Sequence, residues 1–202
     1  MRVLTGMIGK KLNSPLTTSL GRIFDAAAAV LGLVREVTYE GEGPIRLEGL
    51  AGKEYSGWRL DRETGKLVPL NTGTESGSTT PFFRLNPGPL IRHLAENRSS
   101  VSAERLALRF HEAIASSVTT LCSALRDRVE VNRVVLSGGV FQNLLLRKLL
   151  IPELRAGGFD VYFNRRVPPG DGGLAVGQLY YQPTREAAPE IPADGSGLVC
   201  RS

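Results

Sequence analysis

The chain has 202 residues, of which 42% are hydrophobic and 22% charged, a composition typical of a soluble globular domain. The net charge is +5, but no basic run exceeds two residues (as at 10–11 and 165–166) and no aromatic residues lie among them, which argues against a nucleic-acid-binding surface. Two distant cysteines exclude a disulfide framework and suit a reducing cytoplasm. No signal peptide or apolar stretch of the ~20 residues that span a membrane is present, so we expect a soluble, cytoplasmic protein.

The first half of the chain predicts helices separated by turns. Residues 1–12 resemble the tail of a helix, and residues 13–15 (NSP) mark a turn. Apolar residues at helical spacing predict a helix over 19–34, with Ser19 as its N-cap. Residues 39–44 (YEGEGP) indicate a loop and 45–51 a short helix. Residues 55–80, rich in Gly, Ser and Thr, predict a short hairpin and a loop.

The second half alternates helices and strands. Helices are expected from 86–87 to 97, over 102–128, over 143–154 with a stop at Gly157 and Gly158, and over 171–180. Strands are expected over 131–136 and 160–163, with a loop over 166–170. This alternation predicts an α/β domain with some parallel strand pairing. The composition of residues 183–202 predicts a disordered tail after an ordered domain of residues 1–182.

A glycine pair stands where the strand over 131–136 meets the next helix, in the stretch VVLSGGVFQN. In open α/β sheets, ligands bind beyond the carboxyl ends of strands, where helix N-termini offer free N–H groups. Gly138 and Gly139 would let a phosphate or nucleoside approach the backbone, and the amide of Asn143 could face the same ligand. The alternative is a tight turn that needs glycines only for its backbone angles.

Two aspartates are further candidates. Asp171, in PPGDGG, follows the second strand, so both turns could open on one sheet edge, where a carboxylate could ligate a metal or bind a sugar. Its alternative is a simple N-cap. Asp25, in GRIFDAAAA, lies on a helix with little side-chain bulk, which another backbone or a ligand could approach; the alternative is an exposed charge.

The two histidines, His93 and His111, do not stand at metal-ligand spacing. Each is expected on a helix surface or as a hydrogen-bonded core residue. No Ser-His-Asp arrangement and no Walker-type phosphate loop can be identified in the sequence, which therefore assigns no catalytic residue.

Three segments together resemble one family: NSPLTTSLGRIFDAAAAVLGL, VVLSGGVFQNLLLRKLL and RRVPPGDGGLAVGQ are similar to the C-terminal part of HypF, the carbamoyltransferase of NiFe-hydrogenase maturation. The stretches LNPGPLIRHL and ALRFHEAIA are similar to its intervening segments, so the resemblance covers about residues 10–182. It implies the second lobe of an actin-like, ribonuclease-H-like (ASKHA) domain, incomplete in this chain.

The resemblance also implies a function. HypF-like enzymes make carbamoyl-adenylate from carbamoyl phosphate and ATP, and the actin-like domain passes the carbamoyl group to the C-terminal cysteine of HypE. The implied ligands are therefore ATP or carbamoyl-adenylate and a divalent metal, with iron, zinc and magnesium not distinguished. The positions that match the family's nucleotide contacts are Asp25 (ribose), Gly41 (on a looser pattern), Gly138, Gly139 and Asn143. Asp171 matches the metal-ligating aspartate.

The sequence departs from the family in one respect that bears on chemistry. The family's metal site also uses an HxxxH pair from the first lobe, which this sequence lacks, so we expect weak metal binding and no complete reaction from this chain alone. The leading hypothesis is a carbamoyltransferase lobe acting with another chain that supplies the first lobe and with a HypE-like acceptor. The alternatives are a non-catalytic truncated nucleotide-binding module and a relative of the tRNA threonylcarbamoyl-adenosine enzymes. The sequences of LSGGVFQN and PPGDGG argue against the second alternative, because they resemble the hydrogenase-maturation branch.

Overall fold

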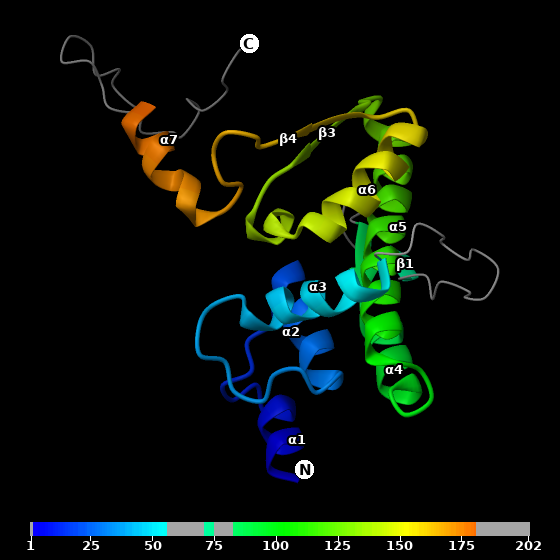
Figure 1. Ribbon diagram of the computed structural model, residues 1–202, viewed down its shortest axis with the longest axis vertical. Helices are drawn as coiled ribbons and strands as arrows, with labels where there is room; N and C mark the ends of the chain where they lie inside the picture. The colour runs from blue at the N-terminus through cyan, green and yellow to red at the C-terminus, as the bar shows by residue number, and fades with distance from the viewer. Residues whose placement is uncertain (1, 56–70, 75–82, 181–202) are drawn as a thin grey trace.

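The computed structural model describes residues 2–55, 71–74 and 83–180 (Figure 1). The elements of the first half are α1 (Arg2–Gly9), α2 (Leu20–Val30), α3 (Glu42–Tyr55), β1 (Asn71–Thr74), β2 (Phe83–Asn86) and α4 (Gly88–Asn97). Those of the second half are α5 (Ala103–Val129), β3 (Arg133–Leu136), η1 (Gly139–Gln142), α6 (Leu144–Ala156), β4 (Asp160–Phe163), η2 (Asp171–Gly173) and α7 (Leu174–Tyr180). The α/β alternation predicted for the second half is confirmed.

The long helix α5 runs along most of the length of the molecule, and elements from both halves of the chain pack on it (Figure 1). One end of α5 packs against α3 and α4, and α2 packs on both of these helices and reaches α5 through Phe24. Helix α6 packs at the other end, with β4 against α6 and β3 paired to β4. Ser102 caps α5 by accepting a hydrogen bond from the Arg105 N–H at 3.3 Å, and Glu130 ends it in a left-handed conformation. Within α5, a stripe of fully buried residues forms the centre of the core: Leu106, Ala107, Phe110, His111, Ile114 and Ala115.

Helix α2 ends earlier than the sequence pattern predicts, at Val30 instead of residue 34. Gly32 adopts φ +73°, and the N–H groups of Gly32 and Leu33 donate to the carbonyls of Ala29 and Ala28. This pair of bonds is a Schellman motif, which ends a helix because the left-handed residue turns the chain away from the helix axis. Leu33, directly after Gly32, packs on the core from the connecting segment.

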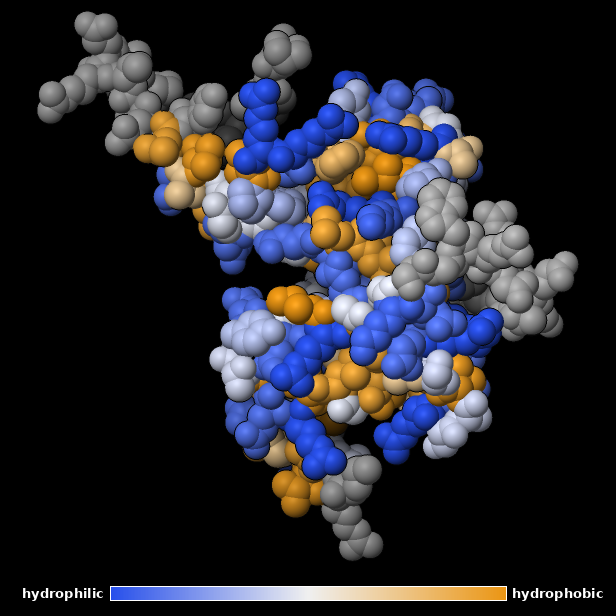
Figure 2. All heavy atoms as spheres, viewed as in Figure 1, coloured by the Kyte–Doolittle hydropathy of each residue, from blue (hydrophilic) through white to orange (hydrophobic). Residues whose placement is uncertain are grey.

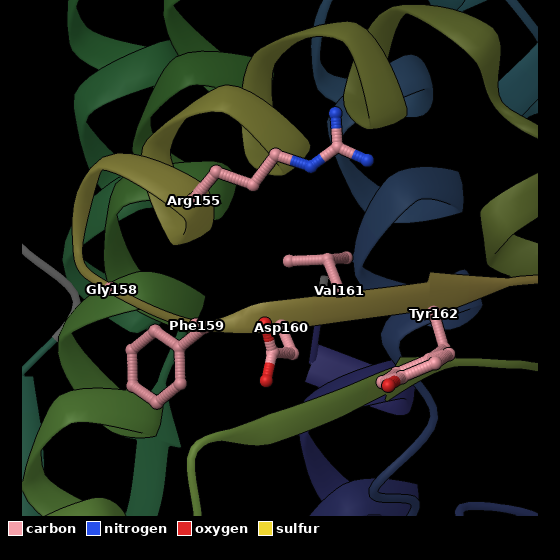
Figure 3. Close-up of a pocket in the computed structure, with 6 residues that line it drawn as sticks. All are labelled: Arg155, Gly158, Phe159, Asp160, Val161 and Tyr162. Atoms are coloured by element: carbon pink, nitrogen blue, oxygen red, sulfur yellow. The ribbon is translucent and has the colours of Figure 1, made fainter.

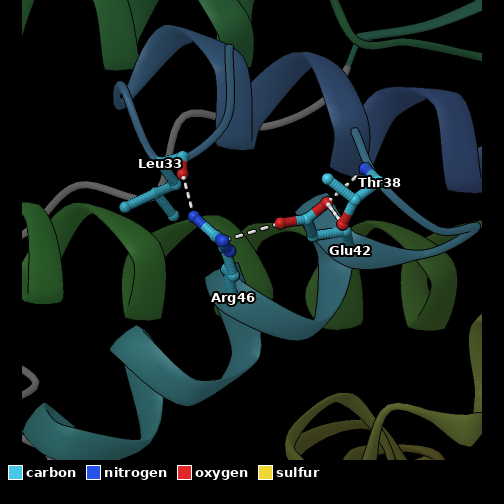
Figure 4. A network of polar contacts seen from close by, with 4 residues as sticks. All are labelled: Leu33, Thr38, Glu42 and Arg46. Atoms are coloured by element: carbon cyan, nitrogen blue, oxygen red, sulfur yellow. Dashed lines mark hydrogen bonds and ion pairs between the residues drawn. The ribbon is translucent and has the colours of Figure 1, made fainter. Parts of the chain in front are cut away.

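The loop predicted over 39–44 is wrong in its second half, because α3 already begins at Glu42. The Glu42 carboxylate accepts hydrogen bonds from the N–H of Thr38 at 2.7 Å and from its hydroxyl at 3.0 Å, and it pairs with Arg46 at 2.6 Å (Figure 4). Arg46 also donates to the Leu33 carbonyl at 3.0 Å. Pro44 is tolerated in the first helical turn, where its missing N–H would have no partner. The short helix predicted over 45–51 is therefore part of a longer one that runs to Tyr55.

The Glu42 network fixes the connection between α2 and α3. The side chain is only 2% exposed, so an ionised carboxylate there needs the donors that surround it. The N–H of Thr38, and after it the Thr38 hydroxyl and the Arg46 charge, hold the pKa of Glu42 below its ordinary value of 4.5, against the opposing effect of burial.

Two small sheets complete the fold. Strands β1 and β2 pair antiparallel. Strand β2 lies beyond the segment 55–80 in which a hairpin is predicted, and of that segment only Tyr55 and β1 are among the described residues. Strands β3 and β4 pair in parallel, with Leu136 opposite Phe163 at their carboxyl ends. One face of this second sheet packs on the core, while Val135 and Tyr162 on the other face are 69% and 53% exposed. The predicted tail over 183–202 also lies outside the described residues.

Helix α7 extends away from the rest of the chain, with Leu174 and Leu179 62% and 70% exposed (Figure 1). None of the helices that the structure describes is long and apolar enough to cross a bilayer.

Candidate functional site

The turns that follow β3 and β4 lie side by side. Because the strands are parallel, their carboxyl ends meet at one edge of the sheet. The Gly138 N–H donates to the Pro169 carbonyl at 2.7 Å, which joins the two turns directly. Gly170 approaches so closely that a Cβ atom on it would lie 3.1 Å from the Cα of Gly139. The predicted convergence of the glycine pair and the Asp171 loop at one edge is confirmed.

Gly138 is required by the backbone conformation of the turn, and both Gly138 and Gly139 face open space. Gly138 has φ +102°, a conformation that residues with a side chain rarely adopt. A Cβ atom added to Gly138 or Gly139 would meet nothing within 4 Å. A ligand could therefore approach the backbone at this turn, which is the property that a phosphate or nucleoside site needs. Asp171 is exposed at the start of η2, beside the same turn.

Asn143 lies between η1 and α6 and is only 8% exposed. Its Oδ1 accepts a hydrogen bond from the Leu146 N–H at 2.7 Å, so it is the N-cap of α6. Its Nδ2 lies 3.0 Å from Nε2 of His111. The prediction that the amide is free to face a ligand needs refinement, because the oxygen and one amide hydrogen already have partners inside the protein.

The N-terminus of α6 carries a carboxylate that sequence reasoning missed. Glu48, on α3, accepts hydrogen bonds from the N–H groups of Leu144 at 2.7 Å and Leu145 at 3.2 Å. Asn143 accepts from the next N–H group, that of Leu146. Side chains of this chain therefore occupy the three N–H groups at the N-terminus of α6, where an anion could otherwise bind. The expectation of free N–H groups at the helix after the glycines is wrong for α6. The glycine turn and η1, which come first, are the parts open to a ligand.

Asp25 and Gly41 lie on the α2–α3 side of the molecule. Asp25 pairs with Arg22 at 3.0 Å and keeps 30% of its side chain exposed. A Cβ atom on Gly43 would lie 3.2 Å from Oδ1 of Asp25 and 3.3 Å from Cβ of Ala28. The small-residue face of α2 is thus occupied by the α3 backbone, one of the two possibilities open from the sequence. Gly41, with φ +83°, precedes α3.

A chain of buried contacts connects the predicted residues on the α2–α3 side with those at the glycine turn. Phe24, next to Asp25, packs edge-to-face on the His111 ring with 5.3 Å between centroids, and His111 bonds Asn143. Helix α2 also contacts η1. On the surface, Figure 2 shows a recess between the part that contains α2 and α3 and the part that contains α6, β3 and β4.

Comparison with known proteins decides the family. Residues 1–178 match the model of the carbamoyltransferase, Kae1-like domain, second subdomain. The chain belongs to the HypF carbamoyltransferase family. It is 34% identical over 187 residues to carbamoyltransferase HypF2 of Cupriavidus necator, covering 86% of this chain and 23% of that protein. It is 32% identical to the probable carbamoyltransferase HypF of Methanocaldococcus jannaschii, covering 88% of this chain and 21% of that one.

A solved HypF structure has the same fold. The crystal structure of full-length HypF in the phosphate- and nucleotide-bound form superposes with a TM-score of 0.71 at 29% identity, covering 88% of this chain and 22% of that one. The chain thus spans about a fifth of the length of these HypF proteins. The mixed helix and sheet architecture agrees with part of an actin-like domain, as the resemblance implied.

The described residues do not by themselves make a metal centre. Over 2–55, 71–74 and 83–180, no group of three His, Cys, Asp or Glu side chains could hold an ion. Asp171 supplies a single exposed carboxylate. His93 and His111 cannot complete a site with it, since His111 is buried and hydrogen-bonded within the core and His93 lies on α4, beside Asn97 at 3.2 Å. His111 is a hydrogen-bonded core residue, one of the two environments expected for the histidines.

A separate surface hollow lies away from the glycine turn. It has a volume of about 570 Å³ and is lined by Arg155, Gly158, Phe159, Asp160, Val161 and Tyr162 (Figure 3). These residues surround the amino end of β4, whereas the glycine turn and the Asp171 loop follow the carboxyl ends of the strands. Because the hollow lies at the opposite end of β4 from the glycine turn, we assign it no part in the candidate site.

Proposed function

We propose that the chain holds the nucleotide in the second lobe of a carbamoyltransferase site. The observation that carries the proposal is the meeting of the Gly138–Gly139 turn and the Asp171 loop at one sheet edge, in a chain of the HypF family. The HypF structure that it resembles was determined in a phosphate- and nucleotide-bound form, which is consistent with a nucleotide at this edge.

Each residue has a defined role in the proposal. Gly138 and Gly139 let the nucleotide approach the backbone, because no side chain fills the space before them. Asp25 binds the ribose hydroxyls, and Gly41 lies close to the nucleoside. Asn143 contributes its remaining amide hydrogen.

The proposed reaction transfers a carbamoyl group from carbamoyl-adenylate to the C-terminal cysteine of a HypE-like acceptor. A C–S bond forms at the carbamoyl carbon, the C–O bond to AMP breaks, and AMP leaves with the electron pair while the thiol proton goes to solvent. This chain's part is to bind and orient the nucleotide, and Asp171 offers one carboxylate to any cation that the complete site holds. The first subdomain must supply the rest of the site.

Binding and transfer can be measured separately. The chain is mixed with a polypeptide that carries a HypF first subdomain, and the heat of binding of ATP or a non-hydrolysable carbamoyl-adenylate analogue is recorded. Transfer is then followed by mass spectrometry of the acceptor's C-terminal peptide. Binding with transfer supports the proposal, binding without transfer indicates a non-catalytic nucleotide-binding module, and no binding refutes the proposal.

Asp171→Ala provides a sharper test of the assigned edge. Because Asp171 is exposed, its replacement should change the free energy of unfolding by no more than about 0.5 kcal/mol. In the reconstituted enzyme it should abolish transfer. Asp160→Ala, which removes an exposed aspartate at the other end of β4, is the matched control and should keep activity. Full activity in Asp171→Ala would remove this residue from the site.

A further inference from the structure

His111 lies in the middle of α5 and is fully buried. Its Nδ1 is 2.8 Å from the Ala107 carbonyl oxygen, which can only accept a hydrogen bond. The proton of the neutral ring must therefore be on Nδ1, which leaves Nε2 as an acceptor. The donor that faces Nε2 is Nδ2 of Asn143, at 3.0 Å.

The same contacts determine the orientation of the Asn143 amide. The Leu146 N–H donates to Oδ1, so the other atom of the amide must be nitrogen, as the contact with His111 also requires. A flipped amide would place an NH₂ group against the Leu146 N–H and an oxygen against the bare Nε2, and both contacts would be repulsive. One hydrogen of Nδ2 then remains, and its direction is fixed by the hydrogen that His111 accepts.

Asn143 connects the glycine turn to α6. Its N–H donates to Val140 at 3.2 Å within the turn, and its carbonyl accepts from Arg147 at 3.2 Å within the helix. His111 also packs edge-to-face against Phe24, whose neighbour is Asp25. One buried ring thus contacts both the residue that ends the glycine turn and the helix that carries the proposed ribose ligand.

We propose that His111 is a positioning residue of the nucleotide site, which accepts a hydrogen bond from Asn143 and thereby aims its free amide hydrogen at the ligand and sets the glycine turn against α2. This inference rests on the proposed function. His111 itself does not touch the ligand, because it is fully buried.

The ring stays in the accepting form at neutral pH. Burial lowers the pKa of His111 to about 4, outweighing the opposite effect of the hydrogen bond to Ala107. A protonated ring would turn Nε2 into a donor opposite the Asn143 NH₂ group. The arrangement therefore requires the neutral ring.

Two replacements separate the hydrogen bond from the packing. His111→Gln can place a side-chain oxygen near the position of Nε2 and accept from Asn143, whereas His111→Phe keeps a ring against Phe24 but accepts nothing. His111→Phe leaves the buried Nδ2 of Asn143 without its acceptor, so the amide loses the hydrogen bond that holds its orientation. We expect His111→Phe to weaken binding of the carbamoyl-adenylate analogue about 10-fold or more, with the first-subdomain polypeptide present. His111→Gln should keep affinity within about 3-fold.

Two further measurements exclude a general structural effect. In an Asn143→Ala background, His111→Phe should weaken binding no further, because the group through which it acts is gone. Nitrogen NMR of the histidine rings in the chain alone should find the proton on Nδ1 of His111 and none on Nε2. Equal affinity of His111→Phe and wild type, equal loss in both replacements, or a proton on Nε2 would overturn the inference. The NMR measurement needs no ligand and no variant, so it tests the hydrogen bond between Asn143 and His111 even if His111→Phe does not fold. Absence of nucleotide binding by the wild type would instead refute the proposed function.

Discussion

Replacing Glu48 tests whether a side chain of α3 caps α6. Its carboxylate accepts hydrogen bonds from the first two N–H groups of that helix, at 2.7 and 3.2 Å. Glu48→Ala leaves those N–H groups to water, whereas Glu48→Gln keeps an oxygen acceptor and removes the charge. The two replacements therefore separate the hydrogen bonds from the interaction with the helix dipole.

The expected magnitude follows from the two effects. Loss of a helix N-cap costs typically ~1 kcal/mol, and loss of a negative charge at a helix N-terminus costs about 0.3–1 kcal/mol. Glu48→Ala should thus lower the free energy of unfolding by about 2 kcal/mol, and Glu48→Gln by about 1 kcal/mol. For a chain of this size, 2 kcal/mol corresponds to a fall in Tm of roughly 4–8 °C.

Urea unfolding followed by circular dichroism measures these changes, with Glu96→Ala as the control for replacing an exposed helical glutamate. Leu144→Pro adds a direct test, because proline fits the first helical position and has no N–H to donate to Glu48. Asn143, with φ −62° and ψ 109°, already has the extended conformation that precedes proline. In the Leu144→Pro background, the effect of Glu48→Ala should fall by roughly half. If Glu48→Ala destabilises no more than Glu96→Ala, Glu48 does not cap α6.

Three further outcomes are expected from unfolding measurements. Gly43→Ala should destabilise by about 1–3 kcal/mol because its methyl group would crowd α2, whereas Gly49→Ala on the same helix meets nothing within 4 Å and should stabilise; equal effects would contradict the packing. Since the pKa of His111 is lowered to about 4 from 6.5, the unfolded chain binds its proton first, so stability should fall by about 3 kcal/mol as pH drops from 6.5 to 4. His111→Gln should remove that slope, and a slope unchanged in the variant would rule His111 out as its source. The lowered pKa of Glu42 gives stability that is present above pH 4.5 and lost below it, and Glu42→Gln should flatten this acid limb.

Local patterns in the sequence were sufficient to predict most of the second half of the fold. The helices over 102–128 and 143–154 and the strand over 160–163 agree with α5, α6 and β4 to within two residues. Their apolar spacing and end signals are local properties that tertiary contacts reinforce. The meeting of the glycine turn and the Asp171 loop was also predictable, because two parallel strands must end at the same edge of a sheet.

What only the tertiary structure decided is how the candidate site is supported. Glu48 reaches α6 across 96 residues of sequence and His111 reaches Asn143 across 32, so no local pattern indicates either bond. The start of α3 at Glu42 was hidden for a related reason: the residues E-G-P favour a turn, and the helix begins there because the carboxylate is held by Thr38 and Arg46. The sequence by itself determined which backbone turns could approach a ligand, through glycine chemistry and strand order. The folded chain alone determined which side chains hold those turns in place, because a buried polar group must find its partner wherever packing brings one within reach.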